Sequence, residues 1–369
     1  MHIAIDAREL TGQRTGAGRY LDRLLYYWGR GDTARRHRFT LYAHAPIPDF
    51  APALDARVEV LPGRGGTTWE QITLGAAVRR NRPDVLFAPA YTAPILIPVP
   101  VALTVHDVSF VAHPEWFRPR ERWRRRLLTE AAARRAEVVL TVSHFSGEEI
   151  RRLLHVAASR IVVIPHGLGL LDDPQNGDGA RGSASPPAHR PPTVLFVGSL
   201  LNRRHVPELV EAIALVCREL PEVRLVIVGD NRTWPRQDPA ALARKLGIAS
   251  HVDVRAFVSE PELRRLYAEA SAFAFLSEYE GFGLTPLEAM AAGVPPLVLE
   301  TPAAREIYGN AARYVTTPDP HEVAGALTTL LTDEPSRTAL LARAPLVLRR
   351  YRWIDAAHAT LQAIEGAVG

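Results

Sequence analysis

Two glutamates eight residues apart enclose a glycine-rich turn in the second half of the sequence, where Glu280 begins the segment and Glu288 ends it. The residues that follow the first glutamate are Gly281, Phe282, Gly283 and Leu284. Glycine lets backbone N–H groups approach a ligand closely, and the first turn of a helix presents unpaired N–H groups that favour a phosphate. A carboxylate accepts hydrogen bonds from sugar or ribose hydroxyls. The segment therefore predicts a site for a ligand that carries both phosphate and hydroxyl groups, as a nucleotide-sugar does.

Two glycines and two arginines near predicted strand ends extend this site. Gly198 and Gly229 each follow a short apolar run, and Arg203 and Arg204 come soon after the first of them. Ligands of parallel sheets bind at the carboxyl ends of strands, and arginine pairs bidentately with phosphate oxygens. We therefore expect the two arginines to bind a diphosphate. An adjacent arginine pair is also common on a solvated surface, and the sequence does not decide which of the two faces the ligand.

The first half of the sequence contributes a glycine loop and a histidine. Gly16 lies in Thr-Gly-Ala-Gly-Arg-Tyr (15–20) at the start of a predicted helix, where the loop amides either hold a diphosphate or simply begin the helix. The loop is no dinucleotide fingerprint, because Leu21 stands where a third glycine is needed. His106, followed by Asp107, ends a predicted strand and should face a ligand, the alternative being a histidine packed in the core.

Short apolar runs alternate with amphipathic helical runs, which predicts parallel sheets covered by helices. Residues 171–192, rich in Gly, Ser, Pro and Asp, have the composition of a linker. The expected fold class is α/β, with two Rossmann-like domains that face each other across a cleft. The predicted strands are 2–6, 38–43, 84–88, 101–105, 137–142 and 161–164, then 193–198, 223–228, 252–257, 272–276 and 294–299. The predicted helices of the first half include 18–28, 69–80, 120–135 and 144–155.

Composition bounds the class of protein. The chain has 369 residues, of which 47% are hydrophobic and 23% charged, with a net charge of +4, as expected of two globular domains. No Asp-x-Asp triplet has supporting ligands and no Cys/His cluster has metal spacing, so neither a metal nor a cofactor is expected. The single cysteine fits a reducing compartment, and no apolar run reaches the roughly 18 residues of a spanning helix. A strand at the very start leaves no room for a signal peptide, so a cytoplasmic protein is expected.

These segments together resemble a known family. The Glu-x7-Glu pattern around Gly-Phe-Gly-Leu, closed by Glu-Ala-Met-Ala, is similar to the signature of the retaining nucleotide-sugar glycosyltransferases of family 4, which have the two-domain GT-B fold. By this resemblance Glu280 contacts the donor sugar and Glu288 the ribose. His106 would then lie beside the donor sugar and Gly16 by the donor phosphates. Arg203 and Arg204 occupy the places of a cationic pair that is commonly an arginine and a lysine.

The resemblance implies a metal-independent hexosyltransferase that moves a hexose or deoxyhexose, of mannose or rhamnose type, from a nucleotide-diphosphate sugar to a glycan or lipid-linked acceptor. It also implies an acceptor-binding domain at 1–170, a donor-binding domain at 193–350, and a helix at 351–369 that crosses back to the first domain. The catalytic residues would be His106, Glu280, Arg203 and Arg204. The alternatives are a nucleotide-sugar epimerase or hydrolase of the same fold, or a nucleotide-sugar binding protein that has lost turnover.

One predicted helix is unusually basic. Residues 118–128 combine arginines with aromatic side chains, among them Arg120, Trp123 and Arg124. Such a helix can lie on an anionic membrane, contact a lipid-linked acceptor, or be an ordinary solvated helix. Nothing resembling a nucleic-acid module accompanies it, so no nucleic acid is expected as a partner. A peripheral position on the inner face of the membrane is therefore a further expectation.

Overall fold

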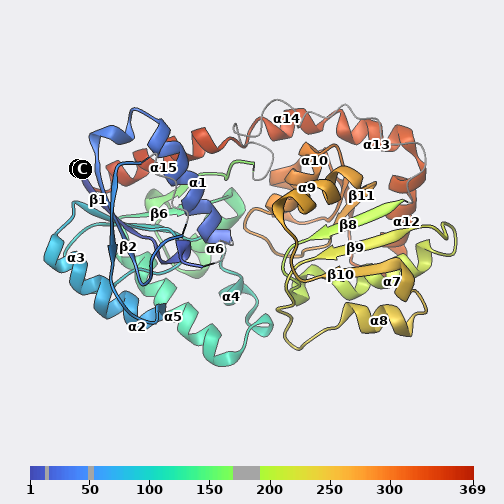
Figure 1. Ribbon diagram of the computed structural model, residues 1–369, viewed down its shortest axis with the longest axis horizontal. Coiled ribbons are helices and arrows are strands. Elements are labelled where there is room, and N and C mark those ends of the chain that lie inside the picture. The colour runs from blue at the N-terminus through green and yellow to red at the C-terminus, as the bar shows by residue number, and fades with distance from the viewer. Residues whose placement is uncertain (13–15, 49–53, 169–191) are drawn as a thin grey trace. The chain divides into compact units, whose positions relative to one another are not determined.

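The computed structural model describes residues 1–12, 16–48, 54–168 and 192–369, which form two compact units (Figure 1). Unit 1 consists of Met1–Gly167 together with Tyr351–Gly369, and unit 2 of Leu168–Arg350. The predicted linker 171–192 lies outside the described residues except for Pro192. Unit 1 is therefore assembled from two separate stretches of the chain.

Unit 1 contains a parallel sheet whose described strands follow the order β3-β2-β1-β4-β5-β6-β7. The order reverses between β1 and β4, and sheets of this kind bind ligands beyond the carboxyl ends of the strands at such a reversal. The strands are β1 His2–Asp6, β2 Arg38–Ala43, β3 Ala56–Val60, β4 Val85–Ala88, β5 Val101–Thr104, β6 Val138–Thr141 and β7 Ile161–Val163. The helices are α1 Gly16–Arg30, α2 Gly66–Thr68, a π-helical segment Trp69–Leu74, α3 Gly75–Asn81, α4 Ser109–Ala112, α5 Pro119–Arg135, α6 His144–Leu153 and α15 Trp353–Gly366.

Alternate residues of a strand point to opposite faces of the sheet, and in unit 1 both faces are covered by helices and buried. Ile3 and Ile5 pack in one core with apolar residues of α1 and α15, and Ala4 packs in the core on the other face. The two helices are joined by a buried hydrogen bond in which Trp28 Nε1 donates to the carbonyl oxygen of Ala357 at 2.7 Å. The last helix therefore completes the core of unit 1.

Unit 2 contains a second parallel sheet, with the described strands in the order β10-β9-β8-β11-β12-β13. Its order reverses between β8 and β11, with α9 and α10 on one side of the sheet and α7 and α8 on the other (Figure 1). The strands are β8 Thr193–Val197, β9 Arg224–Val228, β10 Val252–Arg255, β11 Ala272–Phe275, β12 Pro296–Leu299 and β13 Arg313–Val315. The helices are α7 Val206–Val216, α8 Pro239–Lys245, α9 Glu260–Glu269, α10 Leu284–Ala291, α11 Pro302–Tyr308, α12 Pro320–Thr332, α13 Glu334–Leu341 and α14 Ala344–Leu348.

The structure confirms the α/β class and every predicted strand within one or two residues at each end. It adds β3 and β13, which the sequence analysis missed. Both lie at an edge of a sheet and are partly exposed, so they lack the continuous apolar run of a buried strand. The helix predicted at 69–80 begins instead with a π-helical segment, Trp69–Leu74, before α3.

Candidate active site

Two glycines shape the carboxyl edge of the unit 2 sheet. Gly198 and Gly229 follow β8 and β9 with φ of +143° and +155°, a region that side chains other than glycine rarely adopt. A Cβ atom at Gly229 would overlap the carbonyl oxygen of Gly198, and a Cβ at Gly198 would lie 2.6 Å from the Arg204 guanidinium. The two turns can therefore approach each other, and Arg204 can lie against Gly198, only because both positions are glycine.

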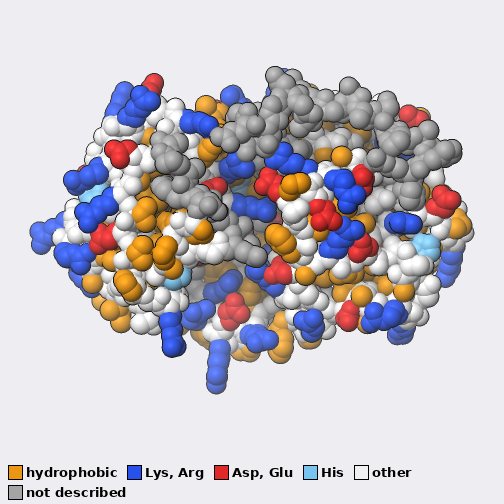
Figure 2. Space-filling model, in the orientation of Figure 1, with side chains coloured by type: hydrophobic (Ala, Val, Ile, Leu, Met, Phe, Trp, Pro, Cys, Tyr) orange, Lys and Arg blue, Asp and Glu red, His pale blue; other side chains and the backbone are white. Residues whose placement is uncertain are grey.

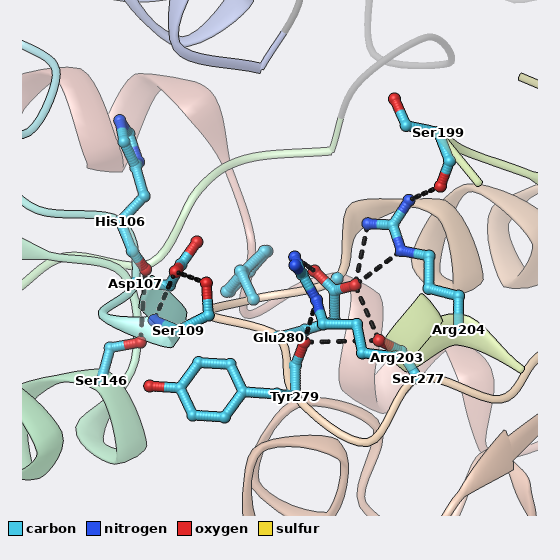
Figure 3. A network of polar contacts seen from close by, with 12 residues as sticks. His106, Asp107, Ser109, Ser146, Ser199, Arg203, Arg204, Ser277, Tyr279 and Glu280 are labelled. Atoms are coloured by element: carbon cyan, nitrogen blue, oxygen red, sulfur yellow. Dashed lines mark hydrogen bonds and ion pairs between the residues drawn. The ribbon is translucent and has the colours of Figure 1, made fainter. Parts of the chain in front are cut away.

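The two arginines after β8 have different environments (Figure 3). Arg203 is 8% exposed, and its Nε donates to the carbonyl oxygen of Tyr279 at 2.9 Å. Arg204 donates from Nε to Glu280 Oε1 at 2.8 Å and from Nη1 to the carbonyl oxygen of Ser199 at 2.9 Å, while its guanidinium lies over Phe275. Arg203 thus holds the backbone of the loop after β11. Arg204 is the arginine that hydrogen-bonds to the Glu280 carboxylate.

Glu280 lies in the loop after β11, so the reversal between β8 and β11 brings it to the arginines. Besides Arg204, its carboxylate accepts a hydrogen bond from the Ser277 hydroxyl at 2.8 Å and lies 3.8 Å from an Arg203 nitrogen (Figure 3). The Glu280 side chain keeps 17% of its surface exposed, so part of it is open to a ligand. The sequence placed these residues at one edge of a sheet but did not show that they pair with one another.

The start of α10 depends on a glycine and a distant tyrosine. Gly283 caps the helix with φ +77°, and a Cβ there would overlap the Tyr308 hydroxyl. That hydroxyl donates to the carbonyl oxygen of Gly283 at 2.8 Å, which fixes the turn from α11. The N–H groups of Leu284 and Thr285 lie in the first turn, where a helix has no carbonyl to pair with them. The segment thus has the geometry of an anion-binding helix start.

The remaining residues of the motif are buried. Gly281 and Phe282 are buried in the turn, and Glu288 is 4% exposed in α10. The Tyr267 hydroxyl donates to Glu288 Oε2 at 2.9 Å. Glu288 therefore has a partner within unit 2, and its contact with a ribose stays a prediction.

In unit 1, His106 follows β5 and is half-buried. Its Nε2 lies 2.9 Å from the carbonyl oxygen of Pro89. Because a carbonyl oxygen only accepts, Nε2 carries the proton, which leaves Nδ1 of the neutral ring as an acceptor. Burial lowers the pKa of His106 and outweighs the raising effects of the Pro89 hydrogen bond and of Asp107. A neutral His106 can accept a hydrogen bond from a hydroxyl group.

A buried charged cluster lies at the end of β1. Arg8 pairs with Asp6 at 2.8 Å and with Glu70 at 2.9 Å, and Thr92 donates to the same Glu70 oxygen at 2.9 Å. Burial raises the pKa of Asp6 to about 6, although Arg8 opposes the shift. The cluster connects the loops after β1 and β4, at the reversal of strand order in unit 1. Glu70 belongs to the π-helical segment Trp69–Leu74.

Gly16 and the basic helix lie at exposed positions. Gly16 begins α1, and nothing lies within 4 Å of a Cβ built there, so the described surroundings do not demand a glycine. Its place by donor phosphates stays a prediction. In α5, Arg120, Trp123 and Arg124 are exposed, and Trp123 keeps 54% of its surface accessible. Arg124 donates to the Thr67 hydroxyl at 3.3 Å.

Neither a metal site nor a membrane span is found in the described part of the chain. Among those residues, no three or more of His, Cys, Asp and Glu are grouped as metal ligands. None of the described helices combines the length and the apolar composition that a bilayer crossing requires.

Comparison with protein families gives two matches in sequence. The family model described as "Glycosyltransferase Family 4" matches residues 14–170, and the model described as "Glycosyl transferases group 1" matches residues 183–346.

Two curated relatives are mannosyltransferases by name. The GDP-mannose:cellobiosyl-diphosphopolyprenol alpha-mannosyltransferase of Komagataeibacter xylinus is 30% identical over 253 residues, which cover 66% of this chain and 60% of the relative. The O-antigen chain mannosyltransferase B of Escherichia coli is 27% identical over 272 residues, which cover 70% of this chain and 68% of the relative. The match thus spans less than two thirds of the first relative's length and just over two thirds of the second's.

Solved structures share the fold. WaaG, described as a glycosyltransferase involved in lipopolysaccharide biosynthesis, superposes with a TM-score of 0.75 at 18% identity, over 99% of this chain and 100% of that one. Anabaena HepE in complex with UDP and glucose gives a TM-score of 0.73 at 19% identity, over 99% of both chains. At this level of identity the likeness shows the fold alone, which is the GT-B type with two Rossmann-like domains.

Proposed function

Because the chain belongs to the family 4 glycosyltransferases, we propose that it transfers a sugar from a nucleotide-diphosphate donor to an acceptor hydroxyl with retention of the anomeric configuration. The observation that carries this proposal is the pairing of Arg204 and Glu280 beside the start of α10. One side of this site is cationic and suits a diphosphate, and the other is a carboxylate that suits sugar hydroxyls. The site lies at the strand-order reversal of the unit 2 sheet, where ligands of such sheets bind.

The chemistry follows from these groups. Arg204 and the first-turn N–H groups of α10 stabilise the negative charge that develops on the leaving diphosphate. Glu280 orients the sugar hydroxyls, Arg203 keeps the loop in place, and Glu288 binds the ribose. The acceptor attacks the face from which the diphosphate leaves, and a diphosphate oxygen takes the acceptor proton. No opposed pair of catalytic carboxylates is needed for this route. His106 contributes a neutral acceptor for a sugar hydroxyl.

Mannose is the sugar that we propose, with a GDP-sugar as the first donor to test. The names of the two curated relatives support this choice, which agrees with the mannose or rhamnose type that the family resemblance implies. We propose a glycan or a lipid-linked sugar as the acceptor.

The test begins with melting temperatures in GDP, UDP, ADP, CDP and dTDP, each with EDTA. A nucleotide at 100 times its Kd adds about 2.7 kcal/mol to the free energy of unfolding, a shift of a few degrees. We expect GDP to stand out in the wild type and to lose about half or more of its stabilising effect in Arg204→Met. Incubation of the matching nucleotide-sugar with and without acceptor glycans then separates transfer from hydrolysis. If the sugar is released as free sugar even when acceptors are present, the protein is a hydrolase. Activity retained in the double variant Glu280→Gln with Arg204→Ala would refute the proposed site.

We propose in addition that the exposed surface of α5 binds anionic lipid. Basic side chains project from the region of α5 in Figure 2, and Trp123 and Leu127 are 54% and 58% exposed among them. Each basic residue near an anionic membrane contributes about 1 kcal/mol, and the exposed tryptophan suits the headgroup region.

Vesicle flotation tests this surface. We expect the protein to bind vesicles that contain 30 mol% phosphatidylglycerol and not vesicles of pure phosphatidylcholine. The bound fraction should rise roughly with the content of anionic lipid. Arg120→Gln with Arg124→Gln should weaken binding at least tenfold. Arg151→Gln with Arg152→Gln removes the same charge from α6 and serves as the matched control, because both of its arginines are exposed. Equal losses in the two double variants would show that net charge, and not α5, attracts the lipid.

A further inference from the structure

The ring of His106 contacts aromatic rings from three other parts of unit 1, and a fourth ring lies against one of these. The Tyr20 ring of α1 meets it edge-on at 5.0 Å between centroids, and Tyr91, after β4, lies at 5.6 Å. The ring of His166, after β7, lies at 5.4 Å. Trp353, the first residue of α15, stacks on His166 at 5.5 Å with an angle of 30° between the planes. The cluster thus reaches from the end of β5 to the helix that closes the chain.

We propose that His166 and Trp353 are positioning residues that fix the orientation and the neutral state of His106 for the proposed reaction. This inference rests on the proposed function for its purpose, but its geometry lies wholly within unit 1. His166 is 7% exposed and Trp353 is 3% exposed, so both are buried, and His166 shields one side of the His106 ring from solvent. The role thereby extends the site to the last helix, which the sequence analysis treated only as a crossing element.

The contact between Trp353 and the chain after β7 leaves little room for adjustment. A Cβ at Gly167 would overlap both the backbone and the indole of Trp353, so glycine is required for the close approach. Tyr91 adopts φ +60°, which is uncommon for a bulky residue, and its N–H donates to the carbonyl oxygen of Thr104 at 2.8 Å. Strained backbone persists where the surroundings hold it in place, and here it turns an aromatic ring against His106.

The charges around the two histidines favour neutral rings. The titratable groups that face His106 are Asp107, Tyr20, Tyr91 and His166. Asp107 already accepts hydrogen bonds from the Tyr91 hydroxyl and from Ser109, which limits its effect on the imidazole. Burial, with a smaller effect from His106, keeps the pKa of His166 well below its usual value. With both rings neutral, His106 keeps its proton on Nε2, which donates to the carbonyl oxygen of Pro89, and Nδ1 stays a hydrogen-bond acceptor.

The test is a pH titration of the histidine ring nitrogens by long-range ¹H–¹⁵N NMR, with His106 identified from the spectrum of His106→Gln. In the wild type we expect His106 to be protonated at Nε2 and to titrate below the ordinary value of about 6.5. In Trp353→Leu the midpoint should rise toward that value and the ring should populate both tautomers, because water reaches the pair. His166→Gln should change the tautomer ratio in the same direction.

The matched control is Trp28→Leu. Trp28 is also 3% exposed and donates a hydrogen bond to Ala357 of α15. Among the described residues its ring contacts are with Phe39 and Phe87 and not with His106 or His166. We expect it to lower the melting temperature while the His106 midpoint and tautomer stay as in the wild type. An unchanged His106 in Trp353→Leu, or the same change in both tryptophan variants, would overturn the proposal.

An activity measurement links the geometry to the reaction. The acid limb of kcat/KM should move to higher pH in Trp353→Leu and not in Trp28→Leu. An acid limb that stays in place while the NMR midpoint moves would overturn the positioning role. A wild type without transfer activity would refute the proposed function instead, and the NMR result would still decide the geometry because it needs no donor.

Discussion

Glu280 and Arg204 should have opposite effects on the binding of a nucleoside diphosphate. In the structure they neutralise each other across 2.8 Å, so a diphosphate must compete with the carboxylate for the guanidinium. Arg204→Met removes a charge-assisted hydrogen bond of about 1.5–3 kcal/mol, which raises the Kd roughly 10- to 150-fold. Glu280→Gln removes the competitor and a nearby negative charge. At about 1 kcal/mol for charges 4 Å apart in water, it should tighten binding roughly fivefold.

Isothermal titration with GDP in EDTA measures both effects. Glu278→Gln is the matched control, because it removes the same charge from the same loop at an exposed position, and we expect its Kd to stay within about twofold of the wild type. Turnover should separate from binding, since Glu280→Gln loses contacts to the sugar and should lower kcat by about 10² or more. If Glu280→Gln raises the Kd for GDP as much as Arg204→Met does, Glu280 holds Arg204 in place for the phosphate. The carboxylate then does not compete with the diphosphate for Arg204, and the prediction is wrong.

Three further predictions concern stability. Gly283→Ala should lower the free energy of unfolding by about 1–3 kcal/mol in urea, because of the left-handed backbone and the Tyr308 hydroxyl, and adding Tyr308→Phe should recover part of the loss. Arg8→Met leaves two buried carboxylates without a cation and should cost about 3–5 kcal/mol at pH 8; the loss should shrink as the pH falls toward 6, because Asp6, whose pKa is about 6 beside Arg8, has a higher pKa without that cation and takes up a proton first in the variant. Burial opposes charge on His205, but Glu208 and Glu278 raise its pKa overall, so its stabilisation is complete below pH 6.5 and is lost as the pH rises through the raised pKa. His205→Gln should therefore lower the melting temperature at pH 5.5 by more than at pH 9.

The fold was predictable because most strands are buried on both faces. Such strands are continuous apolar runs, and the alternation with helices then indicates a parallel sheet. The half-exposed edge strand β3 lacks that signal, and β13 is only three residues long. The π-helical segment has no local signature that distinguishes it from an α-helix.

The site was predictable as a set of residues but not as a network. Glycines at strand ends and a glutamate pair identified the edge of the unit 2 sheet. The sequence could not assign Arg203 to the backbone of Tyr279 or Arg204 to Glu280, because those partners are more than 70 residues away. Tyr308 was missed because its partner is a backbone carbonyl. The signal for His166 is its place after a predicted strand, in Pro-His-Gly, next to the predicted linker.

The hydrogen bond from Trp28 to Ala357 joins residues 329 positions apart, and it sets an order for folding during synthesis. The ribosome releases the sheet of unit 1 first, but α15 emerges only after all of unit 2 has been made. Until α15 is made, the apolar face of α1 that packs against it stays uncovered. Unit 2 consists of one contiguous stretch and is able to fold without waiting for a later segment. Unit 1 can therefore complete its core only after unit 2 has been synthesised, and until then its uncovered apolar surface is prone to aggregation.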